Sequence, residues 1–118
     1  MKNSNVIIDK SYAFALKIVK LCFSIQKEKR EFVLSRQLLK SGTSIGANVE
    51  EAVGGISKAD FLAKMQIAYK EARESQYWLR LLRDSSLLQK QTSSELITDC
   101  TEILRILSAI LKTGKNSK

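Results

Sequence analysis

Between residues 58 and 84, apolar and small side chains recur at alternating intervals of four and three residues. This heptad spacing aligns them along one side of an α-helix, and it is the spacing by which helices pack into bundles. The same pattern occupies residues 96–110, so at least two helices must bury an apolar side. The two series are Phe61, Met65, Ala68, Ala72, Ser75, Leu79 and Leu82, then Leu96, Cys100, Ile103, Leu107 and Ile110.

The rest of the sequence also favours helix. The chain has no proline and no Asn-Gly or Asp-Gly pair that would form a tight hairpin turn. Breaks in the pattern leave four segments with short connections, which make consecutive helices antiparallel neighbours. We therefore predict an all-α fold, an antiparallel up-down-up-down four-helix bundle that forms one domain over residues 1–118. The expected helices lie at about 7–26, 31–52, 58–84 and 93–113.

Capping signals set the expected ends of these helices. Gly54 follows the second segment, where glycine is a poor helix former and a common terminator. Ser57 is expected to cap the third helix, with Asp60 in its first turn. Thr92 and Glu95 have the spacing of a capping box, so we expect the fourth helix to begin there.

The chain has no histidine, which excludes most common catalytic and metal sites. It therefore lacks a general base that titrates near neutral pH, a Ser-His-Asp or Cys-His pair, and the usual zinc and di-iron ligands. We expect no enzymatic activity, no catalytic residue, no metal and no cofactor. Cys22 and Cys100 lie within apolar helical patterns, which favours buried free thiols in a reducing cytosol over a disulfide.

No segment has the length and apolar character of a membrane span. The longest uncharged run, residues 41–49, is nine residues of mostly small or polar type, whereas a spanning helix needs about 20 apolar residues. Charged residues interrupt the first apolar segment, and no small-residue cleavage site follows it. We expect a cytoplasmic protein with no membrane partner.

The formal net charge is +8, which favours a polyanionic partner. Helical spacing gathers the basic residues into two strips. Cations with an aromatic ring among them suit phosphate contact and base stacking, although a strip can also be an ordinary solvated face. The nucleic-acid-binding candidates are Lys10, Lys17, Lys20 and Lys27 in the first helix, and Lys70, Arg73, Tyr77 and Arg80, with Gln66, in the third.

Apolar side chains cover more than half the circumference of the first predicted helix, residues 7–26. A helix at the edge of a monomeric bundle needs a narrower stripe. The surplus favours a subunit interface, so we expect a homo-oligomer, in which each basic strip would be repeated. The alternatives are deeper burial in its own bundle and docking of a protein partner.

Residues 41–48 form an unusual small and polar stretch in the second helix. Its two glycines favour close packing of another helix, because glycine in a helix interior costs about 1 kcal/mol relative to alanine. A phosphate-binding loop is disfavoured, since the Gly-Lys-Ser/Thr ending and a preceding strand are missing. We expect its inward polar groups to form a structural network with the third helix, rather than an acid/base pair or a metal site. The network residues are Ser41, Ser44, Asn48, Glu71 and Glu74.

These two helices also carry a recognisable signature. It consists of Ser41, Ser44-Ile45, Ala47-Asn48 and Glu51-Ala52, then Asp60-Phe61, Lys64, Ile67-Ala68, Glu71, Glu74, Tyr77-Trp78-Leu79 and Leu82. In this the chain resembles the four-helix-bundle proteins encoded in ribosomal-RNA intervening sequences, a family similar to the nucleic-acid-binding accessory proteins of diversity-generating retroelements. The resemblance implies an antiparallel bundle that assembles as a pentamer and has no enzymatic activity. It assigns no binding site, so the basic strips remain an inference from this sequence alone.

Together these features predict a non-enzymatic, homo-oligomeric nucleic-acid-binding protein that acts through basic helix faces. We expect RNA rather than DNA, and phosphate contacts rather than sequence readout. The alternative is a structural adaptor that docks a protein partner through the apolar first helix.

Overall fold

The structure, a computed structural model, describes the backbone of residues 2–116 and side chains within residues 5–116. It contains four helices: α1 (Lys2–Lys29), α2 (Val33–Val53), α3 (Lys58–Asp84) and α4 (Lys90–Asn116). The described part of the chain has no strand. The prediction of an all-α fold is confirmed.

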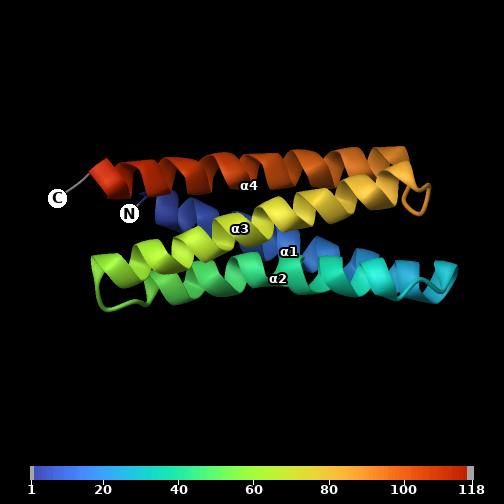
Figure 1. Cartoon of the computed structure of the whole chain (residues 1–118), viewed down its shortest axis with the longest axis horizontal. Helices are drawn as coiled ribbons and strands as arrows, with labels where there is room; N and C mark the ends of the chain where they lie inside the picture. Colours follow the sequence, from blue (N-terminus) through green and yellow to red (C-terminus); the bar gives the residue numbers. More distant parts are fainter. Residues whose placement is uncertain (1, 117–118) are drawn as a thin grey trace.

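The helices lie side by side in an elongated bundle of 49 × 21 × 19 Å (Figure 1). Each helix packs on the next in the chain, and α1 also meets α4, which is the smallest of the four interfaces. Contacts between α1 and α2 run in opposite directions: Ile18 lies against Gly42, and Ser11 lies against Gly46. Figure 1 shows α1 passing behind α3 from the α4 side toward the α2 side. Helices α1 and α4 are therefore in the least extensive contact of any neighbouring pair in the bundle.

The core consists of the heptad positions expected from the sequence. All members of the α4 series are buried, and so are all members of the α3 series except Phe61, which is half-buried at the edge. From α1 the core receives Ile7, Phe14, Ile18 and Ile25. Burial of this continuous apolar surface is the main stabilisation of the fold.

Helices α1 and α4 are longer than predicted at both ends, and α2 differs by one or two residues at each end. Helix α1 begins at Lys2 rather than near Ile7. Helix α4 begins at Lys90, so Thr92 and Glu95 lie inside it, and the capping box expected there is wrong. The amide of Ser93 already donates to the carbonyl of Gln89, which places the helix start before both residues. The capping-box spacing of Thr92 and Glu95 therefore did not predict the first residue of this helix.

Two other helix starts have well-defined caps. Ser57 caps α3 as predicted, since its hydroxyl accepts a hydrogen bond from the amide of Asp60 at 3.0 Å. At α2 the carboxylate of Glu31 accepts from the amides of Val33, Leu34 and Ser35 at 2.8–2.9 Å. It satisfies three of the amides that have no partner within the helix.

Cys22 and Cys100 are free thiols buried in the core, as expected. Burial raises the pKa of each thiol to about 12, which keeps both protonated and unreactive at neutral pH. None of the described helices has an uncharged apolar stretch long enough to cross a bilayer.

Candidate nucleic-acid interface

The basic strip of α3 lies on the outer side of that helix, away from the core. Its five side chains, Gln66, Lys70, Arg73, Tyr77 and Arg80, are all exposed. The opposite side of the helix carries the buried heptad residues, which fix the strip in its outward orientation. The structure therefore brings together the α3 residues that the sequence assigned to one face.

An aromatic group is available in the middle of this strip. Tyr77 is 48% exposed, and the guanidinium carbon of Arg80 lies 5.8 Å from the centroid of its ring. The ring of Trp78 meets it edge to face at 5.2 Å. These two neighbours restrain the tyrosine ring while leaving much of it open to solvent, an arrangement suited to stacking with a planar group.

The three cations of the α3 strip are not held in ion pairs within the described chain. Among the residues that the structure describes, Lys70, Arg73 and Arg80 form no ion pair with a carboxylate. Nearby on α3, Glu74 accepts a hydrogen bond from the indole nitrogen of Trp78 at 3.1 Å. The strip thus presents three cations that form no ion pair in the described chain, within three turns of one helix.

The basic strip of α1 is divided into two parts. Lys10 pairs with Glu102, and Lys17 pairs with Asp99 at 2.8 Å, so both ammonium groups bridge the small α1–α4 interface. The hydrogen bond from Lys17 to Asp99 raises the pKa of Lys17, and the charge of Asp99 adds to the effect. Lys20 is exposed and has no ion pair within residues 2–116.

Lys27 completes the α1 set. It is exposed in the last turn of the helix and likewise has no ion pair within the described chain. Of the four α1 candidates, Lys20 and Lys27 are therefore the two without an ion pair in the described chain, and Lys27 lies next to the α1–α2 turn. The partners of Lys10 and Lys17 lie more than eighty residues away on α4, and no local sequence signal identifies them.

Only part of the polar network expected between α2 and α3 is present. Ser41 is buried and bonds to Ser75 of α3, a partner that we had placed in the heptad series and not in the network. Ser44 donates to the carbonyl of Lys40 at 2.6 Å, and Asn48 donates to the carbonyl of Ser44 at 2.8 Å. These two side chains satisfy their own helix and are half-buried rather than inward.

The two glutamates expected in that network lie on its outer flank. The carboxyl group of Glu71 has a raised pKa, first because it is partly buried and then because of the charge of Glu74. Glu74 is exposed. In the part of the chain that the structure describes, neither residue belongs to a cluster of three potential metal ligands.

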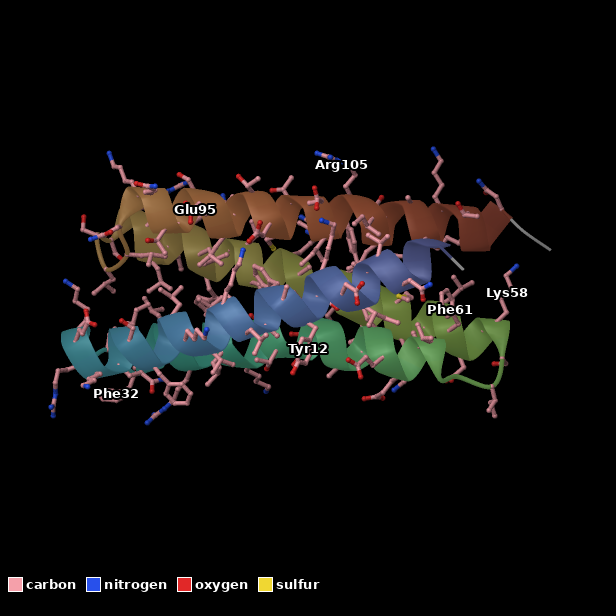
Figure 2. The ribbon with its side chains drawn as sticks, turned by 180° about the vertical axis from the view of Figure 1, so that it is seen from behind. Tyr12, Phe32, Lys58, Phe61, Glu95 and Arg105 are labelled. Atoms are coloured by element: carbon pink, nitrogen blue, oxygen red, sulfur yellow. The ribbon has the colours of Figure 1, made fainter. Side chains whose placement is uncertain are left out.

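Surplus apolar surface on α1 remains uncovered in the single chain. Tyr12, Leu16 and Phe23 are 59%, 48% and 58% exposed, and they follow one side of the helix at intervals of four and seven residues. In Figure 2, Tyr12 lies near the middle of the face formed by α1 and α2, and Phe32 lies at one end of it. We call Tyr12, Leu16 and Phe23 the α1 apolar stripe. It is the surface that the sequence associated with self-association.

Comparison with known proteins decides the family of this bundle. The model of the 23S rRNA-intervening sequence protein family matches residues 3–109, which is most of the chain. The chain belongs to this family. The resemblance inferred from the signature of α2 and α3 is therefore confirmed.

A solved intervening-sequence relative has the same fold. It is a protein of unknown function from the S23 ribosomal protein family of Bacteroides thetaiotaomicron, known from its crystal structure. The two chains are 45% identical and superpose with a TM-score of 0.91, covering 93% of this chain and 98% of that one. No curated protein matches the chain. The family is thus associated by name with ribosomal RNA, and the relative has no assigned activity.

Proposed function

We propose that this intervening-sequence protein is a non-enzymatic, cytoplasmic, homo-oligomeric nucleic-acid-binding protein, and that RNA is its ligand. The observation that carries the proposal is the outer strip of α3. It combines three unpaired cations with the exposed ring of Tyr77. The family's association with ribosomal RNA supports RNA over DNA.

The chemistry of the strip fits contact with a phosphate backbone. Arginine and lysine side chains neutralise phosphates and release bound counterions, which provides affinity without sequence selectivity. A stacked aromatic ring adds affinity that depends little on base identity. Tyr77 and Arg80, whose side chains already contact each other, can offer both interactions to one nucleotide step. Binding is expected to be strongly salt-dependent and weakly sequence-selective.

Self-association would increase the affinity of the protein for RNA. The α1 apolar stripe exposes two aromatic rings and a leucine side chain. Exposed apolar patches of this kind mark interaction surfaces, which favours burial of the stripe against another copy. The pentamer implied by the resemblance would repeat the α3 strip in every subunit. A repeated strip strengthens the long-range attraction for a polyanion.

The test compares two double charge reversals that change the net charge equally. Arg73→Glu with Arg80→Glu reverses two of the three cations of the α3 strip, whereas Lys112→Glu with Lys115→Glu reverses two exposed lysines near the end of α4. Fluorescence anisotropy with a labelled single-stranded RNA measures affinity over a series of salt concentrations. We expect the α3 variant to lose at least about tenfold more affinity than the α4 variant. Equal losses, or binding independent of salt, would refute the proposal.

A second function is favoured by the α1 apolar stripe. The stripe lies on a different helix from the α3 cations, so the chain could act as an adaptor that docks a protein partner there. Leu16→Glu with Phe23→Glu separates the two functions. Loss of RNA affinity together with a smaller mass in light scattering supports the oligomeric RNA binder. A protein partner that survives nuclease treatment, and is lost only in this variant, supports the adaptor.

A further inference from the structure

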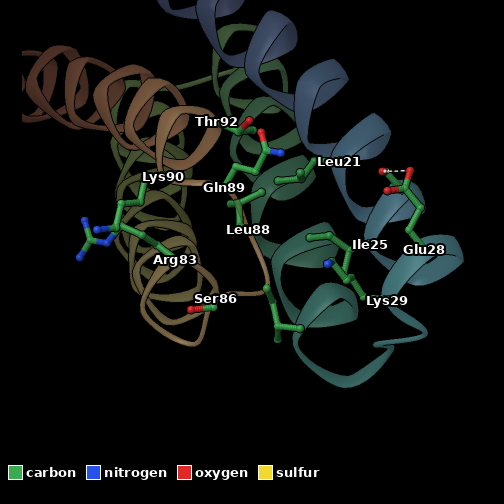
Figure 3. Close-up of a pocket in the computed structure, with 12 residues that line it drawn as sticks. Leu21, Ile25, Glu28, Lys29, Arg83, Ser86, Leu88, Gln89, Lys90 and Thr92 are labelled. Carbon is green, nitrogen blue, oxygen red and sulfur yellow. Dashed lines mark hydrogen bonds between the residues drawn. The ribbon is translucent and has the colours of Figure 1, made fainter.

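A cleft of about 510 Å³ opens at the end of the bundle that holds the α1–α2 and α3–α4 turns. It lies between the last turns of α1 and the connection from α3 to α4 (Figure 3). The ion pairs of Lys10 and Lys17 join α1 to α4 nearer the middle of the bundle. The cleft therefore occupies the part of the α1–α4 interface that these pairs do not close.

The cleft has an apolar floor. Leu21 and Ile25 come from α1, and Leu87 and Leu88 come from the α3–α4 connection. Figure 3 shows Leu21, Ile25 and Leu88 between the two sides of the opening. Its volume is within the range of about 300–1,000 Å³ that is usual for small-molecule sites.

Uncharged hydrogen-bonding groups surround this floor. Ser24, Ser86, Gln89 and Thr92 all line the cleft. Gln89 is exposed, and Figure 3 shows its side-chain amide beside Leu21 and Leu88. The side-chain amide of Gln89 and the hydroxyl of Thr92 can donate and accept hydrogen bonds, so they can satisfy the polar edge of a ligand whose face rests on the leucines.

Three cations and one carboxylate stand at the rim. Arg83 is held in an ion pair with Asp84 at 2.8 Å, and the carboxylate of Glu28 accepts from the hydroxyl of Ser24 at 3.1 Å. Lys29 on α1 and Lys90 on α4 form no ion pair within residues 2–116. The ammonium group of Lys29 lies beside Ile25, whereas Lys90 extends away from the leucine floor beside Arg83 (Figure 3).

The α3 strip leads directly to this rim. Arg80 belongs to the strip, and Arg83, three residues later on the same helix, lines the cleft. Side chains three residues apart are neighbours on a helix surface. A polyanion that follows the α3 strip toward the end of that helix therefore arrives at the cleft.

We propose that the cleft holds one unpaired nucleotide of a single-stranded nucleic acid, with the base on the leucine floor and its phosphate at Lys29. This inference rests on the proposed function. A nucleotide combines an apolar planar face, a hydrogen-bonding edge and an anionic phosphate, and the cleft offers a complement to each. A base in a duplex has its faces stacked and its pairing edge occupied, so it cannot enter. The protein therefore binds single strands in preference to duplexes.

The test fills the cleft without removing a charge. Thr92→Trp places an indole inside it, and Ser94→Trp is the matched control, because Ser94 is exposed on α4 and does not line the cleft. The probe is a short single-stranded RNA that carries 2-aminopurine, an adenine analogue whose emission changes when it leaves the base stack. Affinity is measured by anisotropy for this RNA and for its duplex.

The native protein and Ser94→Trp are expected to bind the single strand about tenfold more tightly than the duplex and to change the 2-aminopurine emission. Thr92→Trp is expected to lose both effects while retaining salt-dependent binding through the α3 strip. Equal affinity of the native protein for both RNAs, or an unchanged Thr92→Trp, would overturn the cleft inference and leave the proposed function standing.

A second arm separates failure of the cleft from failure of RNA binding. Adenosine 5′-monophosphate is titrated into the native protein, and the methyl signals of Leu21, Ile25, Leu87 and Leu88 are followed by NMR. Ring-current shifts confined to these methyls, and absent from Thr92→Trp, support a nucleotide site even where the RNA does not bind. Absence of these shifts together with absence of RNA binding refutes both proposals.

Discussion

Ser75 of α3 donates a hydrogen bond to Ser41 of α2, with 2.9 Å between their hydroxyl oxygens. Both side chains are almost completely buried, with exposed fractions of 0% and 1%. The hydroxyl oxygen of Ser75 also lies 2.9 Å from the carbonyl of Glu71 in its own helix. The pair is a polar link within an otherwise apolar α2–α3 contact, and it fixes how these two helices align.

This link predicts energetic coupling between the two serines. Ser41→Ala should lower the free energy of unfolding by about 1 kcal/mol, since it leaves the buried Ser75 hydroxyl without its partner on α2. The Ser41→Ala, Ser75→Ala double variant should cost less than the sum of the single changes, by at least about 0.5 kcal/mol. Urea unfolding of the four proteins measures this difference. Additive costs would show that the hydrogen bond does not couple the helices.

Two glycines of α2 predict opposite responses to the same substitution. A β-carbon at Gly42 would lie 2.8 Å from Cγ2 of Ile18, a fully buried side chain of α1. Such overpacking costs about 1–3 kcal/mol, which outweighs the gain of about 1 kcal/mol in helix propensity. A β-carbon at Gly46 would meet Ser11 at an ordinary 3.4 Å.

We therefore expect Gly42→Ala to lower the melting temperature and Gly46→Ala to leave it unchanged or raise it. Calorimetry of the two variants provides the measurement. Each variant serves as the control for the other, because both substitutions lie in the same helix and add one methyl group. A common direction of change would mean that α1 does not approach α2 as closely as the structure has it.

Glu31 predicts a pH dependence of stability. Partial burial opposes ionisation of this carboxyl, but hydrogen bonds from the amides of Leu34, Ser35 and Val33 outweigh it and lower the pKa. A carboxyl whose pKa is lower in the folded chain stabilises the fold above its unfolded pKa, near 4.5. That stabilisation is lost as the pH falls from this value through the folded pKa.

Glu31→Ala should therefore lower the free energy of unfolding by about 1 kcal/mol at neutral pH. It should also flatten the dependence of stability on pH below about 4.5. Denaturant unfolding at a series of pH values measures both effects. Glu50→Ala, a change at an exposed position of α2, is the control and should leave the pH profile unaltered.

The core and the outward orientation of the α3 strip were predictable because they depend on periodicity within one helix. Residues such as Ala72 and Tyr77 take opposite sides of α3 from their spacing alone. Asn48 was misplaced because it lies at the edge of its apolar stripe, where small rotations of the helix decide between core and surface. Its amide could be satisfied within its own helix, so burial was not required.

The remaining features of the site depend on contacts between distant parts of the chain. The pairing of Lys10 with Glu102 requires the alignment of the first helix with the last, which no local pattern encodes. The cleft arises because α1 and α4 separate beyond Lys17, and the divergence of two helices is a property of the whole bundle. Periodicity in the sequence predicts which side of a helix is buried. The acidic partner of a lysine and the position of a cleft can be read only from the folded structure.

The ion pairs between α1 and α4 predict a gain of affinity when their acids are removed. Asp99→Asn with Glu102→Gln would free Lys17 and Lys10 and raise the net charge by two from +8. Both pairs are exposed, so the cost in stability should stay below about 1 kcal/mol for each. The variant should therefore fold normally while leaving all four lysines of the α1 strip without an ion pair.

Released lysines that contact RNA should steepen the dependence of the logarithm of affinity on the logarithm of salt concentration. The expected increase is about 0.7 for each additional phosphate neutralised by a lysine on a single strand. Asp9→Asn with Glu50→Gln is the control, since it changes the net charge equally but breaks no ion pair within the described chain. Equal slopes for the two variants would place the α1 strip outside the RNA interface. A steeper slope for the first would mean that contacts with α4 limit how much of the positive charge of α1 can act on a polyanion.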